Sequence, residues 1–176
     1  MKWPRGIAMI PPSIRASLAQ GETALADVQV TTFAQGSAIG GKPRPGVGMD
    51  WSPLVGGLTV NDRWFGGALA GYSAGGEHGS IAAGFARVLE DLGHARLLLT
   101  THRVALYPSG QWDSTRVLLA FSIDRRALTE VGVAPRLFQH GRLRLQFADG
   151  SWAMAMAGVL LPIAARRFAR IYRESR

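Results

Sequence analysis

Apolar and polar residues alternate most clearly in the second half of the chain, and this alternation predicts a series of strands. The segment 142–147 is the best example, because its odd-numbered positions are apolar and its even-numbered positions are Arg142, Arg144 and Gln146. A period of two places successive side chains on opposite faces of a sheet. We therefore expect the apolar positions in the core and the two arginines on a face that points outward.

Other segments with β-branched, aromatic or alternating apolar residues extend this prediction along the chain. The dipeptide Asp149–Gly150 predicts a tight hairpin turn, because both residue types accept positive φ angles. About seven antiparallel strands follow from these patterns. The expected strands are 22–33, 96–101, 103–107, 116–124, 127–133, 142–147 and 151–157.

Three segments have the spacing of amphipathic helices, with apolar residues three and four positions apart. The first is 13–19, which Pro12 precedes. The second is 81–92, for which Ser80 is the N-cap and Gly93 the end. The third is 161–173. Proline suits the first turn of a helix, serine the N-cap, and glycine the C-terminal end. In the last helix we expect a buried face formed by Leu161, Ala164, Phe168 and Ile171. We expect the basic residues mostly on the opposite face: Arg166, Arg167, Arg170 and Arg173.

The segment 35–79 has a different character, because it holds most of the 22 glycines of the chain. Glycine weakens regular elements through its backbone entropy. We expect an insertion here, at about 35–93 when the following helix is included, with one hairpin or small extended elements. The predicted organisation is an N-terminal arm and short helix at 1–21, followed by a single domain at 22–174.

The segments LLLTTHRVALY (97–107), FSIDRRALTEVGV (121–133) and LRLQFADGSW (143–152), followed by the terminal helix, form a recurring order of elements. This order resembles the PH-like fold, specifically the bacterial PH-like and GRAM-like domains. The resemblance implies a mainly β, α+β protein: a partly open antiparallel barrel capped by a C-terminal helix, here with a Gly-rich insertion after the first strand. It also implies a non-enzymatic binding or scaffold role.

The formal net charge of +8 indicates an anionic partner, while an ordinary basic surface is the alternative. We expect a protein partner or an anionic lipid headgroup. Nucleic acid is disfavoured, because the chain has no basic strand interleaved with aromatic residues and no recognition helix. The longest apolar run, 152–165, is too short for a membrane span of about 20 residues and is broken by Gly158 and Pro162. A cytoplasmic location is expected, with possible peripheral contact at the inner membrane face.

Cysteine is absent, which excludes disulfides and cysteine-ligated metals. The four histidines lack the spacing of metal ligands, so we expect neither a metal site nor a cofactor. An open barrel edge could pair with a second copy of the chain, which makes a homodimer a further possibility.

The candidate binding residues are basic or aromatic. Arginine and lysine bind phosphates and carboxylates, and tryptophan is stable at a membrane interface. The alternatives are a solvated basic face and tryptophans that anchor the insertion onto the barrel. The candidates are Lys42, Arg44, Arg63, Trp51 and Trp64 in the insertion, and Arg142 and Arg144 on a strand.

A catalytic alternative comes from the segment 71–75, GYSAG, which fits the G-x-S-x-G pattern of serine hydrolases with Ser73 as the nucleophile. That pattern requires a strained turn between a strand and a helix, which exposes the serine hydroxyl. The predicted helix begins several residues too late, and the strands that follow are typical of hairpins rather than of a parallel sheet. A serine hydrolase is therefore the minority hypothesis.

Overall fold

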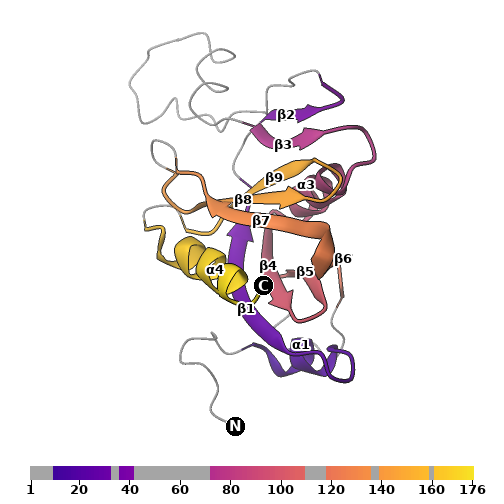
Figure 1. Ribbon diagram of the computed structural model, residues 1–176, viewed down its shortest axis with the longest axis vertical. Helices are drawn as coiled ribbons and strands as arrows, with labels where there is room; N and C mark the ends of the chain where they lie inside the picture. The colour runs from indigo at the N-terminus through magenta and orange to yellow at the C-terminus, as the bar shows by residue number, and fades with distance from the viewer. Residues whose placement is uncertain (1–9, 33–35, 42–71, 110–117, 136–138, 159–160) are drawn as a thin grey trace.

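The computed structural model describes residues 10–32, 36–41, 72–109, 118–135, 139–158 and 161–176. Over these residues the fold is α+β, with a curled sheet of nine strands (Figure 1). The strands are β1 (Ala24–Thr31), β2 (Gly36–Ile39), β3 (Tyr72–Gly76), β4 (His94–Thr100), β5 (Arg103–Pro108), β6 (Phe121–Asp124), β7 (Leu128–Val133), β8 (Arg142–Phe147) and β9 (Trp152–Met156). The helical elements are α1 (Pro12–Ala16), α3 (Ile81–Leu92), the 3-10 turn η1 (Arg125–Ala127) and α4 (Ile163–Glu174).

Seven of these strands form a half-barrel in the order β7–β8–β9–β1–β4–β5–β6, and each pairs antiparallel with its neighbours. All seven lie in segments where the sequence predicts strands. The turn η1 connects β6 to β7 at the two ends of this order. In Figure 1 the group β7–β8–β9 crosses the group β1–β4–β5 at a steep angle, which gives the sheet its curl.

The strands β2 and β3 lie in the predicted insertion and extend the sheet as a branch from β9. Of the two expected alternatives, a hairpin or small extended elements, β2 and β3 fit the second, because they are short strands that pair in parallel. The apolar pieces 54–60 and 64–71 on which the prediction was based lie outside the described residues. Parallel neighbours need a long crossover connection, and the segment 42–71 between them, which is outside the described residues, provides the length for one. β3 then pairs antiparallel with β9 through Ala74–Ala153 and Gly75–Trp152. Part of the Gly-rich segment therefore belongs to the sheet.

The helix α3 begins and ends where the sequence predicts. The Ser80 side chain accepts a hydrogen bond from the backbone N–H of Ala83, and Gly93 ends the helix at φ 65°. On its buried face, the Phe85 ring lies edge-on to Phe121 with 5.6 Å between ring centroids. The segment predicted as an insertion thus contributes a helix to the main core.

The face that α4 buries differs from the expected one. The buried residues are Ala165, Phe168, Ala169 and Tyr172, whereas Leu161 and Ala164 are exposed and Ile171 is only partly buried. The prediction followed large apolar side chains, but the core accepts two alanines that allow a close approach to the sheet. It also accepts the tyrosine, because its hydroxyl donates a hydrogen bond to the carbonyl of Leu128.

Two further predicted elements are shorter than expected. The strand predicted at 116–124 begins only at Phe121, and Leu118 and Leu119, which precede it, are exposed. The helix predicted at 13–19 ends at Ala16. Both differences lie at element ends, where the local pattern is weakest and tertiary contacts decide.

The N-terminal segment packs on the outer face of β1, β4 and β5, away from the main core. It forms a second apolar cluster, in which Ile10 and Ile14 contact Leu98 and Tyr107. We call this surface the closed outer face. Its ion pairs are Arg96–Asp27, which is buried, and Arg103–Glu22, in which the arginine is partly exposed.

Candidate functional site

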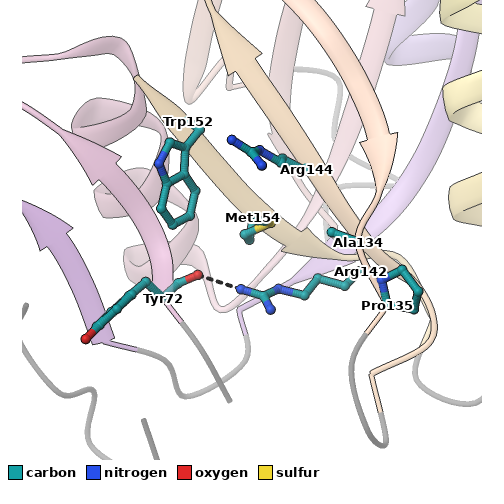
Figure 2. A pocket seen from close by; sticks show the side chains of 7 residues that line it. All are labelled: Tyr72, Ala134, Pro135, Arg142, Arg144, Trp152 and Met154. Carbon is teal, nitrogen blue, oxygen red and sulfur yellow. Dashed lines mark hydrogen bonds between the residues drawn. The ribbon is translucent and has the colours of Figure 1, made fainter. Parts of the chain in front are cut away.

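An open pocket of about 420 Å³ lies on the outer face of β8 and β9 (Figure 2). Two of its lining residues, Arg142 and Arg144, are binding residues that the sequence predicts. The pocket thus brings two of the predicted cations together beside apolar side chains. Its lining residues are Tyr72, Ala134, Pro135, Arg142, Arg144, Trp152 and Met154.

The alternation of β8 and β9 places these side chains on one face. Arg144 pairs with Met154 across the ladder, and Gln146 pairs with Trp152. Directly paired residues of antiparallel strands project to the same side of the sheet. Because Leu143 and Leu145 fill the core on the other side, the basic and aromatic residues must point outward.

Arg144 is exposed and lies against the indole of Trp152, with its Cζ atom 5.6 Å from the ring centroid. Such a contact is a cation–π interaction. One guanidinium nitrogen also donates to Oε1 of Gln146 over 3.2 Å. Within the described part of the chain, no carboxylate lies within ion-pair distance of Arg144. The ring and the amide hold the guanidinium in place without neutralising its charge.

Arg142 is buried, with only 2% of its surface exposed. The expectation that it projects into solvent is wrong, although it lies on the predicted face of β8. Its guanidinium reaches β3, where it donates a hydrogen bond of 2.7 Å to the carbonyl oxygen of Tyr72 (Figure 2). The cause is the antiparallel pairing of β3 with β9, which provides a neighbour that the local pattern of β8 does not reveal.

Gly75 allows β3 to approach the pocket closely. A Cβ atom at this position would lie 2.6 Å from the ring of Trp152, which is shorter than real contacts of this kind. A glycine of the predicted GYSAG motif therefore has a packing role, because it leaves space for the indole.

Ser73 lies inside β3, and 8% of its surface is exposed. The strand continues to Gly76, and α3 does not begin until Ile81. The sharp strand-to-helix turn of a nucleophile elbow is therefore not formed at this serine.

The predicted binding residues of the insertion, Lys42, Arg44, Arg63, Trp51 and Trp64, lie outside the described residues. The aromatic and apolar members of the pocket were not among the predicted site residues. For Trp152 and Met154 a signal was present, since large side chains alternate with alanines in β9. Tyr72 and Pro135 come from distant segments, and only the fold brings them to the pocket.

The pocket can accept an anion that carries an apolar or aromatic portion. A guanidinium donates two parallel hydrogen bonds to a carboxylate or phosphate. Trp152 and Met154 offer apolar surface beside it. Among the described residues, no group of three or more histidines and carboxylates could hold a metal ion.

No family model and no curated protein matches the chain. None of the described helices has the length and apolar character needed to cross a lipid bilayer.

Proposed function

We propose that this protein is a non-enzymatic binding module of PH-like architecture, and that its pocket receives an anionic group from a protein partner or a lipid headgroup. The strand order supports the architecture. The meander β1–β4–β5–β6, then β7–β8–β9, then α4, follows the order of a PH-like domain once β2, β3 and α3 are treated as an insertion after β1. A cytoplasmic location with peripheral membrane contact fits such a module and is part of the proposal.

One observation carries the binding role: the exposed guanidinium of Arg144, held against Trp152 at the open side of the pocket. An arginine that is fixed but not neutralised is prepared for a carboxylate or phosphate, because little side-chain entropy remains to be lost on binding. The neighbouring Trp152 and Met154 would contact the apolar portion of the ligand.

The test measures binding of two soluble probes to the full chain: a short-chain phosphatidylserine below its micelle concentration and a phosphoserine peptide. We expect the wild type to bind at least one probe, more weakly as salt increases. Arg144→Gln should reduce that affinity on the order of tenfold or more, since the substitution removes charge-assisted hydrogen bonds to the ligand and arginine is a frequent binding hot spot. The probe that binds with the higher affinity identifies whether the anionic group comes from a lipid or from a protein.

Arg87→Gln is the matched control, because it removes an exposed arginine on α3 that does not line the pocket. Equal affinities of wild type and Arg144→Gln would reject the pocket as the binding site. The catalytic alternative has its own test. Labelling by a fluorophosphonate that disappears in Ser73→Ala would contradict a non-enzymatic role.

A further inference from the structure

The helix α4 presents a strongly basic outward face. Its buried residues occupy one side, and it packs against β1, β7 and β8 at the periphery of the molecule (Figure 1). On the other side, Arg166, Arg170 and Arg173 are exposed at spacings of four and three residues, so they form one row along the helix. The core buries the apolar side of the helix. The basic row therefore faces outward, where a partner can contact it.

Little acidic charge offsets this row. The one carboxylate on α4 belongs to Glu174, whose nearest contact with Arg170 is 3.9 Å, and both side chains are largely exposed. Exposed pairs at this distance interact weakly. A further arginine lies beside the C-terminal end of the helix, where Arg125 donates a hydrogen bond to the Ser175 side chain. The row thus keeps its net positive charge.

Two exposed apolar side chains mark the start of the same helix. Leu161 is 65% exposed and Ile163 is 67% exposed, and Ile163 precedes Arg166 and Arg167 by three and four residues. Two large aliphatic side chains exposed within three residues of each other, next to a row of cations, favour a surface that meets an apolar phase. The helix therefore combines a row of cations with an apolar end.

We propose that the outward face of α4 docks on an anionic lipid bilayer, with Leu161 and Ile163 entering the interface and the arginine row contacting the headgroups. Charge complementarity favours a phosphate-bearing surface. The apolar pair selects a bilayer over a nucleic acid, because phosphates and sugars offer no apolar layer for aliphatic side chains. This surface is separate from the Arg144 pocket and does not depend on a ligand there.

The experiment is flotation of the full chain with vesicles of phosphatidylcholine alone and of phosphatidylcholine mixed with phosphatidylserine. We expect binding only to the mixed vesicles, and a decrease with added salt. The double variant Arg166→Gln/Arg170→Gln should weaken binding by about 25-fold, since each arginine near an anionic surface contributes a factor of about five. The matched control is Arg15→Gln/Arg87→Gln, which removes two exposed arginines from other helices and should bind within about twofold of wild type.

The absence of native cysteine provides a second readout. Ile163→Cys, labelled with a polarity-sensitive fluorophore, should show a blue shift on mixed vesicles, whereas Arg87→Cys with the same label should not. Three results would overturn the proposal: no binding to mixed vesicles, equal losses in the two double variants, or bound protein whose label at position 163 stays in water. Binding of an oligonucleotide without binding of vesicles would also overturn it.

The pocket and the helix can be separated. Vesicle binding that survives Arg144→Gln but fails in the α4 double variant supports the helix surface alone. Vesicle binding that fails only in Arg144→Gln assigns the membrane contact to the pocket and rejects the helix proposal. Circular dichroism of every variant checks that the fold is retained.

Discussion

The two outer faces of the sheet hold arginines in opposite settings. On the closed outer face, Arg96 pairs with Asp27, and their side chains are 8% and 2% exposed. On the outer face of β8 and β9, Arg144 is exposed, and its partners in the described part of the chain are an aromatic ring and an amide oxygen. Both arginines lie on strands, on the side of the sheet opposite the main core. The difference lies in what covers each face.

This difference separates structural charge from charge that can serve binding. A buried ion pair is costly to break, because removing one partner leaves the other charged and desolvated. An exposed arginine without a carboxylate contributes little to folding and keeps its capacity for a ligand. Three substitutions test this distinction.

The largest effect is expected for Asp27→Asn on the closed outer face. The substitution keeps the shape of the side chain but leaves the charge of Arg96 without its carboxylate. The free energy of unfolding should fall by about 3–5 kcal/mol, as measured by urea denaturation. Glu130→Gln serves as control, because Glu130 is exposed on β7 and should change stability by less than about 0.5 kcal/mol. If Asp27→Asn lowered the free energy of unfolding as little as Glu130→Gln, the Arg96–Asp27 ion pair would not contribute to folding.

A smaller, pH-dependent effect is expected for Glu22→Gln. Burial raises the pKa of this carboxyl, but hydrogen bonds from Thr100, Ala19 and Arg103, together with the charge of Arg103, outweigh burial and lower it below the ordinary 4.5. A lowered pKa stabilises the fold above the unfolded-state value, and this stabilisation disappears as pH falls through the folded-state value. At neutral pH the variant should lose about 2 kcal/mol of unfolding free energy.

The measurement for Glu22 is denaturation of wild type and variant across a series of pH values. Their difference should shrink as pH falls below 4.5, because protonated glutamate then resembles glutamine. Asp149 also has a lowered pKa: burial raises it, but hydrogen bonds from Ser151 and from the backbone of Ile81 have the larger effect. The difference between the two proteins, rather than either curve alone, therefore isolates Glu22. If the difference in stability between wild type and Glu22→Gln stayed constant with pH, the ionised Glu22 carboxylate would not be its cause.

The smallest effect on stability is expected for Arg144→Gln. Its exposed side chain has no carboxylate partner among the described residues, so the free energy of unfolding should change by less than about 0.5 kcal/mol. Thermal and urea unfolding measure this directly. The same variant is expected to lose anion affinity, and that combination is what marks a binding residue. A stability loss comparable to that of Asp27→Asn would place Arg144 among the structural arginines instead.

Much of the half-barrel could be predicted from local patterns. The alternation of β8, the turn at Asp149–Gly150 and the limits of α3 were all visible in the sequence, because each depends on neighbours a few residues apart. The buried face of α4 was predicted only in part: Phe168 is buried as expected, but Leu161 and Ala164 are exposed, since the side that is buried depends on the sheet that receives the helix. The hydrogen bond of the Tyr172 hydroxyl illustrates this dependence, because its acceptor lies on β7.

The sequence by itself determined the segments of the seven half-barrel strands, the limits of α3, the shared face of Arg142 and Arg144 on β8, and the excess of positive charge. Only the tertiary structure decided that these two arginines differ. β3 joins the sheet by antiparallel pairing with β9, and this places the Tyr72 carbonyl against Arg142 and leaves Arg144 beside Trp152. Alternation reports which face a side chain occupies. What covers that face depends on chain segments far away in the sequence, which local periodicity cannot reveal.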